Sequence, residues 1–383
     1  MDCTSALLKK TLPDSDTAQK LSCARTKTEA IVDSVLAPHS VEVAHEALKD
    51  IPYCGVSTDG SNHGAVKIFP IIIQYFDWKA GGVQSKLQDT PNETATTIGN
   101  YLIQTLMKNN LASKCVAFTS DNCNTNFGGT RRDEGGNNVF AHLKRLLQNK
   151  TLIGVGCPAH ILNNCVHHGA DRLNVDIENI IFKIYQYFHI YTVRTESLKE
   201  YCDFLFPGIE RMLQMFPALK AFFLSQEKPP VMIKGFFENP FSEVYLWHMH
   251  SLMSIFHCHI QEMEREDNSI MEIKKILRSI HNIVIERKTN NFMSLKVKGL
   301  LAAHRREGLG EGCEKFLADV LGMYSSCLEY LEKWMAPMEE FTPFMWMDMS
   351  EAPKWDDVEA CIKYLEEKGV AIDDVKCFDQ VSN

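Results

Sequence analysis

The stretch YCGVSTDG, residues 53–60, is a short run of strand-forming residues that ends in an aspartate and a glycine. A second stretch, CVAFTSDN at residues 115–122, has an apolar run typical of a buried strand and also ends in an aspartate. Between them, AVKIFPIIIQYFDW at residues 65–78 is rich in β-branched and aromatic residues, so we expect one further strand there. Asp-Gly and Asp-Asn both favour turns, which places Asp59 and Asp121 where two strands end.

The segments that follow complete an alternating α/β pattern. Residues 83–87 are expected to form a third strand after a glycine turn, and residues 92–109 carry apolar residues at helical spacing. A helix at 139–148, a strand at 152–155 and a helix at 158–168 come next. This order of three strands followed by alternating helices and strands is the plan of an RNase H-like fold, although other α/β domains share parts of it.

The sequence predicts three parts along the chain. Residues 1–50 read as a peripheral helical segment, residues 51–175 as an RNase H-like core with a mixed sheet, and residues 176–383 as an all-helical region. Hydrophobic residues make up 45% of the chain, as in ordinary globular proteins. No apolar run approaches the roughly 18 residues that a membrane-spanning helix needs, so we expect no membrane partner.

Charge and cysteine content limit the classes of function. The chain has 40 basic and 49 acidic residues, a net charge of −9, whereas proteins that grip DNA usually have a basic surface. Either DNA binding lies in a missing module, or it uses a local basic patch, or DNA is not the partner. The pair Arg305-Arg306 could contact phosphate, and the alternative is that it belongs to the ordinary solvated surface. The 13 cysteines lack regular spacing, which favours reduced thiols in the cytosol or nucleus.

Two carboxylates at neighbouring strand ends suggest chemistry on phosphates. If the strands that precede Asp59 and Asp121 are adjacent, both side chains project from one edge of the sheet and can hold divalent cations about 3.5–4 Å apart. Oxygen ligands suit Mg²⁺ or Mn²⁺. One metal would activate a water or a 3′-hydroxyl, and the other would stabilise the leaving oxygen. The alternative is that each aspartate only begins a turn.

Three short blocks carry a resemblance to a known family. STDGS at residues 57–61 and TSDNCN at residues 119–124 resemble the first and second aspartate blocks of hAT-type DNA transposases. GCPAHILNN at residues 156–164 resembles the Cys-x-x-His block of that family. The segments 206–213 and 216–220 are similar to hAT-derived host proteins of the BED zinc-finger type.

The resemblance implies an RNase H-like core interrupted by a large helical insertion. It implies that Asp59 and Asp121 are the first two catalytic, metal-binding carboxylates of an Asp-Asp-Glu (DDE) set, with Mg²⁺ or Mn²⁺ as cofactor. It also implies that Cys157 and His160 lie beside the active site and contact DNA near the cleaved end. Packing within a helix is the alternative for this pair, and two ligands fall short of the four that a structural zinc site needs.

Several parts of the family pattern are missing. We find no Ser-Glu-Arg block that would supply the third carboxylate, and nothing in the sequence places Glu339 or Glu340 at the sheet edge. We therefore expect the C-terminal catalytic part and the dimerisation region to be absent, along with the BED zinc finger. A Thr-Arg-Trp-Leu-Ser segment that relatives carry is also missing before Leu205.

The sequence-based hypothesis is therefore a truncated, domesticated transposase derivative. We expect a catalytically inactive nuclear protein that interacts with DNA or with chromatin proteins. The alternatives are an active metal-dependent DNA strand transferase or nuclease of the hAT type, and an unrelated metal-dependent phosphatase that uses the same two aspartates.

A separate histidine cluster lies in the segment WHMHSLMSIFHCH, residues 247–259. On a helix, His250 and His257 would share a face, whereas histidines two positions apart would point in different directions. We expect an amphipathic helix with partly buried histidines, and weak metal binding is the alternative.

Overall fold

A computed structural model of the chain describes residues 2–63, 66–77, 82–86, 94–129, 136–148, 152–188, 200–265, 268–349 and 351–381. The described part is mostly helical and contains a small sheet, which gives an α/β arrangement plus a helical region. The chain divides into two units, one of residues 1–118 with 139–152 and one of residues 119–138 with 153–383. Within the described residues, no helix is both long and apolar enough to cross a membrane.

The first fifty residues are helical, as the sequence predicted. Several apolar side chains of this segment, among them Val35 and Val41, are exposed. The helices are α1 (Asp2–Thr11), α2 (Asp16–Lys20), α3 (Arg25–Ile31), a π-helical turn η1 (Val32–Leu36) and α4 (Ala37–Lys49).

The main sheet has five strands in the order β5-β4-β1-β6-β7. Strands β1, β4 and β5 form an antiparallel meander in which Gly55 pairs with Gln74 and Thr58 with Ile71. Alternate residues of β1 are buried, which is the period expected of a strand with one face in the core. The strands are β1 (Cys54–Thr58), β4 (Ile71–Asp77), β5 (Gly82–Lys86), β6 (Cys115–Ser120) and β7 (Ile153–Gly156).

The prediction of a single strand over residues 65–78 is wrong. Strand β3 (Val66–Ile68) pairs with β2 (Ser61–His63) in a separate two-stranded hairpin, and β4 begins only at Ile71. Pro70 explains the break, because proline has no backbone N–H and cannot donate to a strand ladder. Residues 65 and 78 of this stretch lie outside the described part.

Two helices of the first unit pack against each other. Helix α5 (Ala95–Lys108) begins at Thr94, whose Oγ1 accepts a hydrogen bond from the N–H of Thr97 at 3.2 Å. It packs on α7 (Val139–Leu146), and a Cβ at Gly99 would lie 3.0 Å from the Cβ of His142. Glycine therefore permits the close approach of the two helices. Residues 92–93 of the predicted helix lie outside the described residues.

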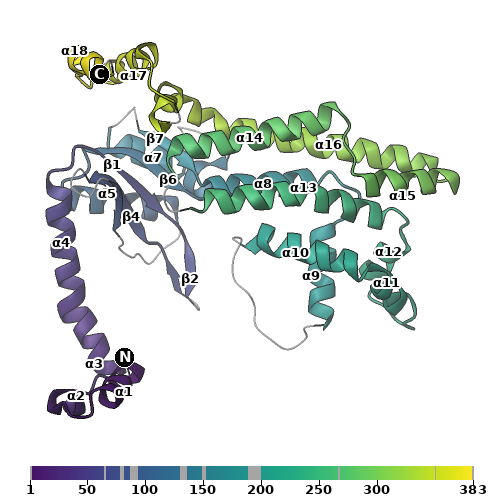
Figure 1. Ribbon diagram of the computed structural model, residues 1–383, viewed down its shortest axis with the longest axis horizontal. Helices are drawn as coiled ribbons and strands as arrows, with labels where there is room; N and C mark the ends of the chain where they lie inside the picture. Colours follow the sequence, from purple (N-terminus) through teal and green to yellow (C-terminus); the bar gives the residue numbers. More distant parts are fainter. Residues whose placement is uncertain are drawn as a thin grey trace. The chain divides into compact units, whose positions relative to one another are not determined.

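The second unit is built around long helices. Helix α8 (Pro158–Ala170) packs along α16 (Gly310–Met335), and α14 (Ile270–Thr289) runs beside α16 (Figure 1). A capping box begins α14, since the Ser269 hydroxyl and the Glu272 carboxylate each accept a hydrogen bond from the other residue's backbone N–H. The remaining helices are α6 (Asn124–Phe127), α9 (Ile177–Phe188), α10 (Glu200–Gln214), α11 (Phe216–Leu224), α12 (Val231–Glu238), α13 (Ser242–Met263), α15 (Leu295–Arg306), the 3₁₀ segment η3 (Ala336–Asp348), α17 (Trp355–Glu367) and α18 (Asp374–Val381).

Candidate functional site

Asp59 directly follows strand β1 and belongs to the first unit. Its side chain is exposed, whereas Thr58 before it is buried. Gly60 follows it in close contact with Phe69, since a Cβ there would lie 3.0 Å from the phenylalanine ring. The aspartate therefore follows a strand end, as the sequence predicted, with its side chain open to solvent.

Asp121 follows strand β6 and belongs to the second unit. Its Oδ1 atom accepts hydrogen bonds from Nδ2 of Asn126 at 2.5 Å and from the backbone N–H of Cys123 at 3.4 Å. Asn126 is buried on the short helix α6 and also donates to Oγ of Ser120 at 2.7 Å. One carboxylate oxygen of Asp121 thus holds the loop that follows the strand.

The environment of Asp121 also affects the neighbouring thiol. Burial, together with the hydrogen bond and charge of Asp121, raises the pKa of Cys123 to about 11. A thiol with so high a pKa stays protonated at neutral pH and is a poor nucleophile. Cysteine chemistry at this loop is therefore disfavoured.

The strands that carry the two aspartates, β1 and β6, are neighbours in the sheet. In the part of the chain that the structure describes, no three histidine, cysteine, aspartate or glutamate side chains form a group that could hold a metal ion. Two aspartates alone are few ligands for Mg²⁺ or Mn²⁺, which prefer octahedral oxygen coordination. The two-metal site at Asp59 and Asp121 stays a prediction from sequence.

The second and third sequence blocks meet in the second unit. The backbone N–H of Cys157, at the start of α8, donates to the carbonyl of Ser120 at 2.8 Å, and Nδ2 of Asn122 donates to the Cys157 carbonyl at 3.4 Å. Gly156 permits this arrangement, because a Cβ there would lie 2.2 Å from Oδ1 of Asn122. His160 is half-buried in the first turn of α8. A DNA contact by Cys157 and His160 stays a prediction.

A polar recess of about 470 Å³ lies between these blocks and the last turns of α16. Tyr330 forms part of its wall, and the His168 ring stacks on the Tyr330 ring with a centroid distance of 4.7 Å. Burial raises the pKa of Tyr330, and hydrogen bonds from Asn164, Trp334 and Asn122 partly offset this rise. The recess can bind a small polar group through these amides.

The charged side chains of the recess balance one another in part. Nζ of Lys333 donates to Oε1 of Glu329 at 2.6 Å, and this hydrogen bond lowers the pKa of the glutamate. Arg172 lines the same recess and adds to the lowering through its charge. Sequence reasoning missed this recess, since no local pattern links residues of α16 to the loop after β6.

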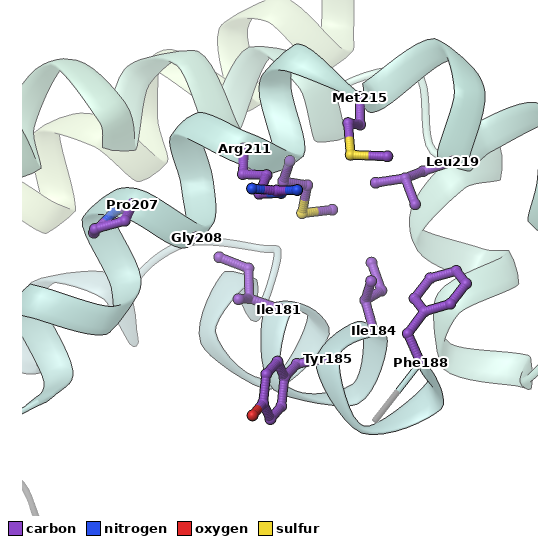
Figure 2. A pocket seen from close by; sticks show the side chains of 10 residues that line it. Ile181, Ile184, Tyr185, Phe188, Pro207, Gly208, Arg211, Met215 and Leu219 are labelled. Atoms are coloured by element: carbon purple, nitrogen blue, oxygen red, sulfur yellow. The ribbon is translucent and has the colours of Figure 1, made fainter. Parts of the chain in front are cut away.

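An apolar pocket of about 660 Å³ lies among α9, α10 and α11 (Figure 2). Ile184 and Phe188 of α9 face Met215 and Leu219 across it, and Arg211 is the one charged residue in its described lining. The described lining of this pocket is mainly apolar, so it can accommodate an apolar group.

The glutamates weighed as a third carboxylate are engaged elsewhere. Glu339 accepts hydrogen bonds from the fully buried Lys274 at 3.1 Å and from Arg278 at 3.2 Å. Burial of Glu339 raises its pKa, but the hydrogen bonds from Lys274 and Thr342 outweigh this and lower it overall. Glu340 accepts a hydrogen bond from Tyr364 at 3.1 Å. Both therefore stabilise the helical region.

The histidines of α13 mainly serve packing. His248 is buried, and burial lowers its pKa to about 3. His250 and His257 share a face, as predicted, and stack on the ring of Phe206 at 5.1 and 5.3 Å. His259 contacts the Ile255 carbonyl at 2.8 Å. These contacts favour the packing interpretation over metal binding.

In comparisons with known proteins, no family model matches this chain and no curated protein matches it. The resemblance to hAT transposases therefore depends on the three sequence blocks.

Proposed function

We propose that this chain derives from the RNase H-like catalytic region of an hAT-type DNA transposase and acts in the nucleus as a DNA-binding module without strand-transfer activity. The observation that carries the proposal is the sheet order, in which the strand before Asp59 neighbours the strand before Asp121. An RNase H-like arrangement requires this adjacency. The hydrogen bond from Cys157 to Ser120 adds support, because it joins the third block to the second.

The loss of catalysis is inferred from how the acidic groups are used. Oδ1 of Asp121 is committed to Asn126 and to the loop backbone. Glu339 is held by Lys274 and Arg278. Removal of one member of a cooperating catalytic set usually abolishes most of the activity. We therefore expect two aspartates without a third acid to support little strand-transfer activity.

The test uses the purified full chain and a labelled DNA duplex with a hairpin end. We expect salt-dependent binding in fluorescence anisotropy, no strand cleavage with Mg²⁺ or Mn²⁺, and unchanged binding in Asp59→Asn. Cleavage that requires Mn²⁺ and disappears in Asp59→Asn would instead establish the active strand transferase or nuclease. Hydrolysis of a phosphomonoester would indicate the metal-dependent phosphatase. If the chain captures chromatin proteins but does not bind DNA, its partner is a protein and the proposed DNA binding is wrong.

A further inference from the structure

The segment RKTNNFMSLKVKGLLAAHRR, residues 287–306, is strongly basic in an otherwise acidic chain. It contains six lysines and arginines and no aspartate or glutamate, whereas the whole chain has a net charge of −9. The segment spans the end of α14, the turn after it and all of α15 (Figure 1). The basic residues are therefore concentrated on one helical hairpin.

The two sides of α15 differ sharply. Its apolar side, with Val297 and Leu301, is buried, and the helix packs on α13 and α16. The opposite side is exposed and carries Lys298 and Arg306. Between these two lies Gly299, around which a Cβ would meet no atom within 4 Å. A charged ligand can therefore approach the backbone of α15 closely.

The acidic groups on the neighbouring helices neutralise only part of this surface. Glu243 of α13 lies 3.8 Å from Lys296, and Glu314 of α16 lies 3.0 Å from Arg305. Glu243 is 34% exposed and the other three side chains are at least 50% exposed, and ion pairs near the surface contribute little stability.

Three cations of the hairpin have no such partner. Among the residues that the structure describes, no acidic side chain pairs with Lys288, Lys298 or Arg306. Lys298 and Arg306 are exposed and Lys288 is half-buried. Together with the exposed Lys296 and Arg305 they form a basic surface, which we call the α15 surface.

The turn that precedes α15 is held in place. Arg287 donates to the carbonyl of Ser251 at 3.1 Å and lies over the ring of Phe292, 4.8 Å from its centroid. Ser294 caps α15 by accepting a hydrogen bond from the N–H of Val297 at 3.4 Å. A surface fixed in this way loses little conformational entropy when a ligand binds.

We infer that the α15 surface binds the phosphate backbone of a nucleic acid. A helix that lies on a membrane needs a continuous apolar face toward the lipid, but the apolar side of α15 is buried and Leu295 is its main exposed apolar residue. Several exposed cations on one helix, without a continuous apolar strip beside them, suit a phosphate chain better. The inference rests on the proposed function and names the surface through which it would operate.

The test is a double charge reversal, Lys298→Glu with Arg306→Glu, in the full chain. Anisotropy is measured with a short DNA duplex and with single-stranded RNA at salt from about 50 to 200 mM, the range over which phosphate contacts dominate affinity. We expect Kd to rise by about tenfold or more at low salt, with a salt dependence weaker by roughly two phosphate contacts. The more strongly affected polymer identifies the source of the phosphates.

The matched control reverses two exposed lysines elsewhere, Lys183→Glu with Lys228→Glu, and so changes the net charge equally. It is expected to leave Kd within about twofold, because long-range charge is screened at these salt concentrations. Circular dichroism melting verifies that both variants fold.

The outcomes separate the two proposals. If the chain binds DNA but both double variants bind equally well or equally poorly, the α15 surface is rejected and the proposed function stands. If the unmodified chain binds neither polymer, both proposals are rejected. Binding to phosphatidylserine vesicles that depends on Lys298 and Arg306, without nucleic-acid binding, would replace the phosphate chain by a membrane surface.

Discussion

Gly169→Ala should weaken the folded state, because α8 approaches α16 at this position without room for a side chain. A Cβ at Gly169 would lie 2.4 Å from Sγ of Cys327 and 3.4 Å from the carbonyl oxygen of Met323. Cys327 is buried, and its thiol donates to the carbonyl of Cys165 at 3.4 Å. The sulfur therefore cannot move aside without losing a hydrogen bond, and the backbone carbonyl can yield little.

The magnitude follows from two opposing effects. Alanine is better than glycine in a helix by about 0.8–1.0 kcal/mol, whereas overpacking of a buried site typically costs about 1–3 kcal/mol. Gly299→Ala in α15 provides the control, since a Cβ there meets nothing within 4 Å. The helix-propensity gain is similar in both variants, so the free energies of unfolding should differ by about 1–3 kcal/mol, which is the overpacking cost.

The assay is urea unfolding followed by circular dichroism for both variants and the unmodified chain. Because the clash involves the sulfur of Cys327, Cys327→Ala should cost less stability in the Gly169→Ala background than alone, and a double-mutant cycle measures this coupling. The reasoning is refuted if Gly169→Ala is as stable as Gly299→Ala, or if the cycle shows no coupling.

Three further predictions concern buried polar groups. Burial lowers the pKa of His248 to about 3, so the free energy of unfolding should fall as the pH drops from about 6.5 toward 3, by up to about 1.4 kcal/mol per pH unit. Unfolding midpoints measured at several pH values should fall less steeply in His248→Leu, and an unchanged slope would contradict this prediction. Glu339→Gln leaves the buried ammonium of Lys274 without its charged partner, so it should lower the free energy of unfolding by about 1–3 kcal/mol, measured by urea unfolding. Adding Lys274→Met to this variant should recover much of the lost stability, and no recovery would contradict the explanation. Asn126→Ala removes the 2.5 Å hydrogen bond to Asp121 and should lower the free energy of unfolding by about 1–3 kcal/mol. An unchanged melting temperature would contradict this prediction.

Elements with strong local signals could be predicted from the sequence. The helix predicted at residues 158–168 is observed as α8 over Pro158–Ala170, and its proline lies in the first turn, where proline is favoured. The strands of the main sheet and the helices α5, α7 and α8 follow one another in the predicted order, whereas the β2-β3 hairpin and the short helix α6 were not predicted. The prediction of one strand over residues 65–78 was wrong. The β-branched residues favour a strand, but Pro70 has no N–H to donate to the strand ladder and interrupts it.

The contacts that build the candidate site could not be predicted. Sequence placed Asp121 at a strand end but gave no sign that Asn126, on a four-residue helix, would bind its carboxylate. Tyr330 and Trp334 reach the loop after β6 from the far end of a 26-residue helix. Such contacts depend on how α8 packs on α16, and amphipathic periodicity shows only that a helix has a buried face, not which partner covers it.

The positions of the charges bear most directly on function. A net charge of −9 argues against a protein that wraps DNA over its whole surface, but phosphate contacts are local and are screened beyond roughly 10 Å at ordinary ionic strength. A patch such as the α15 surface can therefore attract a phosphate chain even though the rest of the chain is acidic. The same acidic excess would disfavour contacts elsewhere and restrict the ligand to that helix. The salt dependence of binding should thus correspond to only a few phosphates, and a dependence typical of an extensive DNA-binding groove would show that other surfaces take part.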